Sequence, residues 1–175
     1  MLLETEALKP KIMLFLCTGN YYRSRFAELL LNNHAKQRGL DWEATSRGLA
    51  LERGVNNVGP ISQHTLAGLA ARGIAVVGEV RRPRALNQSD LANAHHIVAV
   101  NRTEHLPILE RKFPQCVEQV EFWHVHDCDF APPDDALAQI ERSVLGLINR
   151  NVCVSMQIGE THLIEAEQNR FAPSI

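Results

Sequence analysis

The chain has 175 residues, of which 45% are hydrophobic and 22% charged, and this balance is typical of one globular domain around a single core. Its formal net charge of −2 gives no general attraction for nucleic acid, and no apolar run reaches the roughly 20 residues that cross a bilayer. We therefore expect neither a nucleic-acid partner nor a membrane segment.

The start of the chain, MLLETEALKPK, carries acidic residues and lacks the order of charged and apolar segments of a signal peptide, so we expect a cytoplasmic protein. Four cysteines are scattered without a CxxC pair, which argues against a zinc knuckle. We expect no metal, no cofactor, and free thiols in a reducing cytosol. The reactivity of each thiol then depends on its surroundings.

The first half of the chain alternates between strand and helix patterns. Residues 11–17, KIMLFLC, are a near-continuous apolar run that is typical of a strand buried on both faces. From residue 24 onward apolar residues recur at helical spacing, and Gly39 is a suitable helix end. Residues 42–49 predict a second strand and residues 62–73 a second helix.

The second half continues this alternation after a polar, arginine-rich connection over residues 79–95. Residues 96–100 predict a third buried strand, and a helix should cover part of 103–113. A fourth strand is expected over 117–125, followed by a loop whose paired prolines exclude a strand interior. From Leu137 onward the apolar residues keep the period of a closing amphipathic helix.

The alternation predicts an α/β fold in three layers, with helices on both faces of a parallel sheet. We expect one domain over residues 1–150 and a C-terminal extension, 151–175, to which the sequence assigns no role. Ligands of such sheets bind outside the carboxyl ends of the strands. Because Cys17 and the acidic loop after the fourth strand both fall at that edge, we expect them to meet.

The stretch CTGNYYRS, residues 17–24, joins the first strand to the first helix. A loop of this length can aim successive backbone N–H groups at one point, and the helix N-terminus adds unpaired N–H groups and the positive end of its dipole. Gly19 permits backbone conformations closed to other residues, and Asn20 can hold the loop through its amide or adopt a left-handed turn. The sequence therefore predicts an anion-binding loop.

Three side chains of this loop predict nucleophilic chemistry on a phosphoryl group. Arg23 can bind two phosphate oxygens at once through its planar guanidinium. The same positive field should favour the thiolate form of Cys17, and Ser24 can donate its hydroxyl to that thiolate. A strand-end cysteine is more often a small packing residue, but the spacing, the Gly-Asn pair, the arginine and the serine together favour a nucleophile.

The pattern Cys-(x)5-Arg-Ser with Gly-Asn inside resembles the phosphate loop of the low-molecular-weight protein tyrosine phosphatases and of the related thioredoxin-coupled arsenate reductases. FAE at 26–28, SRGL at 46–49 and the later segments RPRAL and DLANAHHIVAV follow in that family's order, so the resemblance covers about residues 11–150. It implies a four-stranded parallel sheet of the flavodoxin-like kind. It also implies metal-independent hydrolysis of a phosphorylated protein or small aryl phosphate through a cysteinyl-phosphate.

On this resemblance the rest of the loop is expected to bind the substrate, through Thr18, Gly19, Asn20, Tyr21, Tyr22 and Ser24. Phe130 is expected to wall the pocket together with Tyr21, and simple packing of the two tyrosines is an equal alternative. The family commonly has a cysteine where Tyr22 stands, so a disulfide within this loop is excluded. Arg25 stands in place of a common proline and is expected to be a second cation near the pocket mouth.

The family takes its general acid from an Asp-Pro pair in the loop after the fourth strand, and one carboxyl can act as acid and then as base. Here the loop reads HDCDFAPPDD, so Asp127 and Asp129 compete and neither precedes a proline. Counted from Trp123, which resembles a tryptophan in that strand of the reductases, Asp127 is the better match. We take Asp127 as the acid and Asp129 as the second choice.

Two other functions would use the same loop. A phosphate-binding regulatory protein with weak or no turnover would fit the missing Asp-Pro pair and the two tyrosines. An arsenate reductase would need further cysteines, and Cys128 is the one expected near Cys17. The sequence does not indicate the oligomeric state.

Polar residues elsewhere receive plainer interpretations. Arg81, Arg82 and Arg84 are expected to form a solvated face, with a tie from Arg84 to the rest of the fold as the alternative. Asn101 and His105 follow the third strand at the same sheet edge and have no assigned role.

Overall fold

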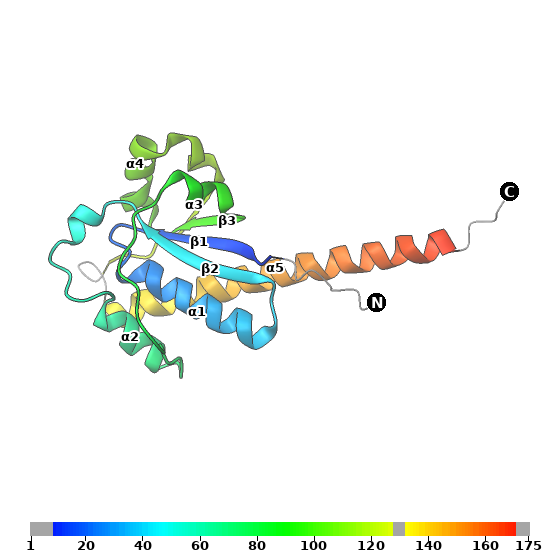
Figure 1. The fold of residues 1–175 in the computed structure, drawn as a ribbon, viewed down its shortest axis with the longest axis horizontal. Helices are drawn as coiled ribbons and strands as arrows, with labels where there is room; N and C mark the ends of the chain where they lie inside the picture. Colours follow the sequence, from blue (N-terminus) through cyan, green and yellow to red (C-terminus); the bar gives the residue numbers. More distant parts are fainter. Residues whose placement is uncertain (1–8, 128–131, 171–175) are drawn as a thin grey trace.

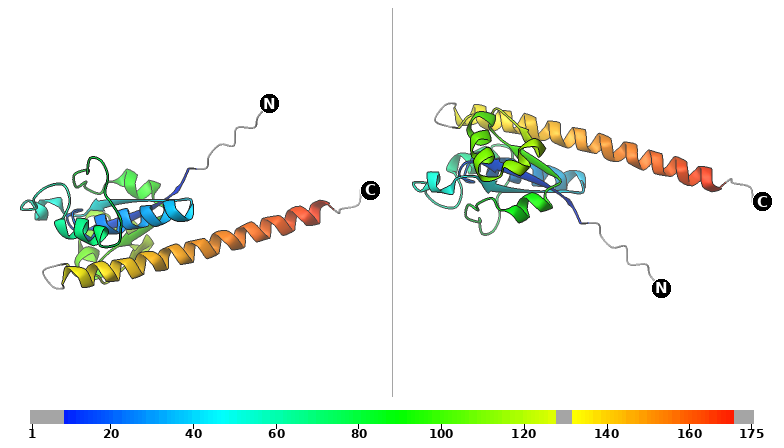
Figure 2. Two further views of the ribbon diagram at one scale, coloured as in Figure 1. Left: turned by 90° about the horizontal axis from the view of Figure 1, so that it is seen from below. Right: turned by 90° about the horizontal axis from the view of Figure 1, so that it is seen from above.

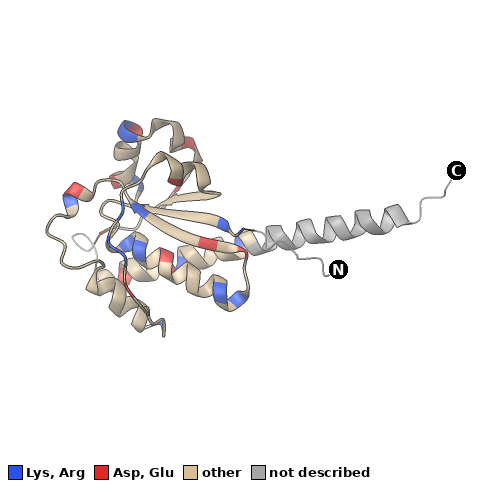
Figure 3. Cartoon of the chain, in the orientation of Figure 1, with Lys and Arg blue, Asp and Glu red and all other residues tan. Residues whose placement is uncertain are grey.

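The computed structural model describes residues 9–127 and 132–170, with side chains as far as Asn151. A sheet lies between two layers of helices, and the last helix extends beyond the rest of the domain (Figure 1, Figure 2). Basic and acidic residues are interspersed over the described part of the chain (Figure 3), in keeping with the small net charge. None of its helices is long and apolar enough to cross a membrane.

The strands of the sheet are β1 (Lys11–Cys17), β2 (Trp42–Gly48), β3 (His96–Ala99) and β4 (Val120–Phe122). They pair in the order β2-β1-β3-β4, and every pairing is parallel. The expected α/β fold with a four-stranded parallel sheet is therefore confirmed. Because all strands run the same way, the segments that follow them gather at one edge of the sheet.

One face of the sheet is covered by α1 (Arg23–Arg38), α2 (Gln63–Ala70) and α5 (Pro133–Arg170). The other face carries α3 (Gln88–Asn93), α4 (Arg102–Lys112) and the 3-10 helix η2 (Pro114–Gln119). In β1, Phe15 and Cys17 face the first layer, whereas Leu14 and Leu16 face the second. Successive strand residues point to opposite faces, so this central strand needs an unbroken apolar run.

Two elements differ in more than their end residues from what the sequence predicts. The fourth strand was expected to begin at residue 117, but η2 occupies residues 114–119 and β4 begins at Val120. The strand β4 pairs with β3, and β3 has only four residues, so β4 can form few ladder hydrogen bonds. The closing helix α5 continues through the expected extension as far as Arg170, and the division of the chain near residue 150 stays a prediction.

Candidate active site

The loop after β1 packs against the end of β2. At Gly48 an added Cβ would overlap a methyl group of Leu51 and lie 3.0 Å from the carbonyl oxygen of Thr18, so a side chain there would displace the loop. Gly19 does not have a positive φ, so the expectation that this glycine adopts a backbone conformation closed to other residues is wrong. The left-handed residue is Asn20, with φ of 50°.

Asn20 is fully buried and its side-chain amide uses all of its hydrogen-bonding capacity. Nδ2 donates to Ser24 Oγ at 3.1 Å and to Ser46 Oγ at 2.7 Å. Oδ1 accepts from Nη1 of Arg81 and from the backbone N–H of Arg84, both at 3.0 Å. This one amide therefore ties the loop to α1, to β2 and to the connection before α3.

Arg81, Glu28 and Ser46 form a hydrogen-bonded cluster next to the Asn20 amide. Arg81 Nη2 donates to Glu28 Oε2 at 2.6 Å and to the Ser46 carbonyl at 3.1 Å, and the Ser46 hydroxyl donates to the same carboxylate. Arg25, only 2% exposed, donates to the Arg81 carbonyl at 3.4 Å and does not line the pocket described below. The expected solvated face is thus wrong for Arg81, because its guanidinium donates to Glu28 and Ser46. The expected cation at the mouth is wrong for Arg25, because its side chain is buried and donates to the Arg81 carbonyl.

The Cys17 thiol lies where β1 ends and is 3% exposed. Its Sγ is 2.9 Å from Ser24 Oγ and accepts the Asn20 backbone N–H at 3.2 Å. Since Ser24 Oγ already accepts a hydrogen bond from the Asn20 amide, its own proton is available to the sulfur. Both neighbours can therefore stabilise a negative charge on Sγ.

Arg23 is 2% exposed and brings together the ends of three elements. It donates to both carboxylate oxygens of Glu104, from Nη1 at 3.0 Å and from Nη2 at 2.8 Å. Nη1 also donates to the Val125 carbonyl at 3.0 Å, and Nη2 to Asp127 Oδ2 at 2.7 Å. Burial opposes its charge, but the hydrogen bonds to Glu104 and the charges nearby outweigh it and raise the pKa of Arg23.

The residues after β3 support the loop from the other side. His105 is fully buried; its Nδ1 accepts the Asn101 N–H at 3.1 Å and its Nε2 lies 3.3 Å from Thr18 Oγ1. Burial, helped by the charge of Arg23, lowers the pKa of His105 to about 3, so the ring is neutral and donates Nε2–H to Thr18. Asn101 Oδ1 accepts the Glu104 N–H at 3.1 Å and caps α4.

Sequence reasoning missed Glu104. A signal for it existed, because an acidic residue in the first turn of the helix after β3 falls at the same sheet edge as the loop. That placement could have led to Glu104 but not to its partner, since the choice of partner depends on side-chain directions.

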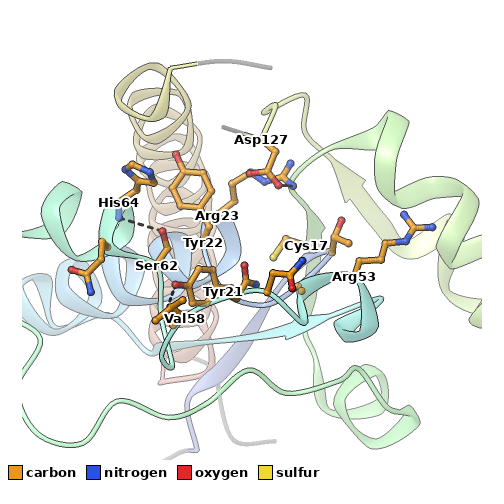
Figure 4. Close-up of a pocket in the computed structure, with 15 residues that line it drawn as sticks. Cys17, Tyr21, Tyr22, Arg23, Arg53, Val58, Ser62, His64 and Asp127 are labelled. Atoms are coloured by element: carbon orange, nitrogen blue, oxygen red, sulfur yellow. Dashed lines mark hydrogen bonds and ion pairs between the residues drawn. The ribbon is translucent and has the colours of Figure 1, made fainter. Parts of the chain in front are cut away.

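A pocket of about 490 Å³ opens over Cys17 (Figure 4). Seven of the expected site residues line it: Cys17, Thr18, Gly19, Tyr21, Tyr22, Arg23 and Asp127. The rest of its wall is mostly polar and comes from the segment after β2 and the start of α2, including Arg53, Asn57, Ser62 and His64. Asn20 and Ser24, also expected here, are fully buried and stand behind the lining.

The two tyrosines both line the pocket and pack. Tyr21 donates its hydroxyl to the Val58 carbonyl at 2.6 Å, which ties the loop to the far wall of the pocket. Tyr22 is 7% exposed, donates to the Pro133 carbonyl at 3.1 Å and lies edge-on to His64 with ring centroids 6.0 Å apart. Lining of the pocket and packing, the two alternatives that the sequence left open for these tyrosines, therefore occur together.

Some expected residues, Asp129, Phe130 and Cys128, lie outside the described part of the chain. Of the cysteines that are described, Cys116 is buried in the core on the opposite face of the sheet from Cys17. Within the described residues no group of three or more His, Cys, Asp or Glu side chains is placed to hold a metal ion.

Comparison with known proteins finds a match over residues 12–144 to the model of one family, low molecular weight phosphotyrosine protein phosphatase. A comparison with curated proteins found no significant match. Three solved structures illustrate the likeness in fold. The low molecular weight protein tyrosine phosphatase from T. tengcongensis is 24% identical, covers 80% of this chain and 99% of its own, and has a TM-score of 0.67.

The YwlE arginine phosphatase from Geobacillus stearothermophilus is 20% identical, with coverage of 95% and 100% and a TM-score of 0.64. Wzb from Vibrio vulnificus, in complex with benzylphosphonate, is 15% identical, with coverage of 80% and 98% and a TM-score of 0.67. At these identities the likeness is one of fold.

Proposed function

Because this chain belongs to the low molecular weight phosphotyrosine protein phosphatase family, we propose that it is a metal-independent phosphatase acting on phosphotyrosine or a similar aryl phosphate. The observation that carries the proposal is the setting of the Cys17 sulfur. It receives the Asn20 N–H, lies 2.9 Å from the Ser24 hydroxyl, and faces a pocket that also contains Arg23 and Asp127. A nucleophile, an anion-binding group and a carboxyl therefore surround one space.

The reaction would proceed in two displacements. The Cys17 thiolate attacks phosphorus, the bond from phosphorus to the aryl oxygen breaks, and Asp127 gives its proton to the departing phenolate. Water then attacks the cysteinyl-phosphate, Asp127 takes the proton of that water, and the bond from sulfur to phosphorus breaks. The loop amides and Arg23 stabilise the charge on the phosphoryl oxygens in both steps.

The lining of the pocket favours an aryl phosphate. The side chains of Tyr21 and Tyr22 can contact a flat ring, and Arg53 on the wall adds a positive charge that would repel a cationic substrate. One matched structure holds benzylphosphonate, a phosphonate with an aromatic ring, and others are arginine phosphatases. Phosphoarginine is therefore the alternative substrate to compare with phosphotyrosine.

Turnover of p-nitrophenyl phosphate and of a phosphotyrosine peptide, both with a chelator present, tests the proposal. Cys17→Ser should abolish turnover of both. Asp127→Asn should slow hydrolysis of the peptide more than hydrolysis of p-nitrophenyl phosphate, because p-nitrophenolate leaves readily without a proton. Normal turnover by Cys17→Ser would refute the mechanism. Phosphate binding without turnover by the intact protein would instead favour a regulatory role, and faster hydrolysis of phosphoarginine would correct the substrate.

A further inference from the structure

Two carboxylates contact the guanidinium of Arg23. Glu104 accepts hydrogen bonds from both terminal nitrogens, at 3.0 and 2.8 Å, in the side-by-side geometry that fixes the plane of a guanidinium. Asp127 accepts from Nη2 at 2.7 Å. In this state the two terminal nitrogens each donate to two protein acceptors, so a phosphoryl oxygen can reach them only by replacing one of these.

The two carboxylates lie in different places relative to the pocket. Asp127 is part of its lining and lies beside Arg23 in Figure 4, whereas Glu104 does not line the pocket. An anion that enters over Cys17 therefore meets the Asp127 side of the guanidinium first. The side that Glu104 holds is turned away from it.

Glu104 is also held in place by its own element. Its backbone N–H is bound by the cap residue Asn101, and it lies in the first turn of α4, where the helix dipole favours a negative charge. The adjacent His105 is fully buried and neutral, and its Nε2 lies 3.3 Å from Thr18 Oγ1 and 3.6 Å from Glu104 Oε2, so Arg23 at 2.8 Å is the closer partner of the carboxylate. The two hydrogen bonds to Arg23 and the cap of α4 therefore hold Glu104 in place behind the guanidinium.

We infer that Glu104 is the positioning residue of Arg23, and that a bound phosphoryl group replaces Asp127, not Glu104, on the guanidinium. The inference rests on the proposed function in taking a phosphoryl group as the ligand. Its consequence is an order of events: substrate binding frees Asp127 from Arg23, beside the position that the leaving group must occupy. Glu104 meanwhile keeps the guanidinium in its plane, so that the Nη2 donor released by Asp127 points to the phosphoryl group.

Titration calorimetry with inorganic phosphate tests this without requiring turnover. Each of Glu104→Gln and Asp127→Asn removes one negative charge beside the same guanidinium, so charge alone predicts tighter phosphate binding by both variants. Our inference predicts opposite signs. Asp127→Asn removes a competitor and should bind phosphate roughly tenfold more tightly, whereas Glu104→Gln releases the guanidinium plane and should bind it roughly tenfold more weakly.

Glu110→Gln is the matched control, because it changes the same charge on an exposed part of the same helix and should leave phosphate affinity unchanged. If Glu104→Gln binds phosphate as tightly as the intact protein or more tightly, the inference is wrong. Where Glu104→Gln lacks a cooperative thermal transition, Glu104→Asp replaces it. That variant keeps the charge but is one methylene shorter, so weaker phosphate binding supports positioning and unchanged binding refutes it.

Kinetics separate this inference from the proposed function. In an active enzyme, Glu104→Gln should lower kcat/KM for p-nitrophenyl phosphate by about a hundredfold, with most of the loss in kcat, because a displaced guanidinium no longer matches the transition state. An unchanged kcat would contradict the inference while leaving the phosphatase intact. An intact protein without turnover, whose two variants still shift phosphate affinity in opposite directions, would refute the proposed function and support the inference.

Discussion

Asn20→Ala should be among the most damaging single changes outside the hydrophobic core. The side chain is fully buried, and alanine removes its four hydrogen bonds while the backbone must keep a φ of 50°. The two bonds to Ser24 and Ser46 lie in fully buried surroundings where water cannot replace them. The two from Arg81 and Arg84 come from a partly exposed segment, where water can replace them in part.

These differences set the magnitude. Each bond to a buried serine is worth about 1 kcal/mol, and each bond from the more exposed segment about half of that. Left-handed backbone adds about 1 kcal/mol once the residue carries a Cβ without a compensating polar group. Asn20→Ala should therefore lower the free energy of unfolding by about 4 kcal/mol, which corresponds to roughly 12 °C in Tm for a domain of this size. Asn20→Gly avoids the strain and should lose about 3 kcal/mol.

Urea denaturation of the two variants measures both contributions, with Asn57→Ala as control. Asn57 is exposed on the pocket wall, and its replacement should change stability by no more than about 0.5 kcal/mol. A loss below about 1.5 kcal/mol for Asn20→Ala would refute the hydrogen-bond argument. Equal stability of the alanine and glycine variants would refute the strain argument.

Two further changes test the surroundings of the loop. Gly48→Ala should destabilise the protein by about 2 kcal/mol and slow turnover, since its Cβ meets Leu51 and the Thr18 carbonyl. Gly146→Ala in α5 would meet only Arg150 Nη1, at 3.9 Å, and should stabilise the protein by about 0.5–1 kcal/mol; thermal unfolding of both variants gives the comparison. The pKa of His105 is about 3 in the folded protein and 6.5 in the unfolded chain. Below pH 6.5 the unfolded chain therefore binds a proton that the folded protein does not bind, and the free energy of unfolding falls as the pH drops. Between pH 7 and 5.5 this loss should be about 1 kcal/mol and should disappear in His105→Gln; an equal loss in that variant would contradict a neutral buried ring.

The loop and its flanking elements were predictable because their signals are local. The apolar run of β1, the spacing from Cys17 to Arg23 and the left-handed glycine after α1 all depend on near neighbours in the chain. The short β4 was not predictable in this way. Its length depends on how many residues its partner β3 offers, and that is a property of the assembled sheet.

The charged residues show the same limit. Arg81, Arg82 and Arg84 look alike in the sequence, yet the guanidinium of Arg81 alone turns inward to Glu28, because that carboxylate stands beside it across the loop. Burial of one charge requires a partner at hydrogen-bonding distance, and distant segments supply it only after folding.

Local spacing along the chain was enough to predict that Cys17, Arg23 and a helix N-terminus lie together, since strand, turn and helix geometry set those distances. It was also enough to predict Asp127 at the same edge, because parallel strands end together. Folding decided which carboxylates contact Arg23. Glu104 and Asp127 come from segments 81 and 104 residues away, and only the packing of α4 and the end of the sheet brings their oxygens within hydrogen-bonding distance of one buried guanidinium.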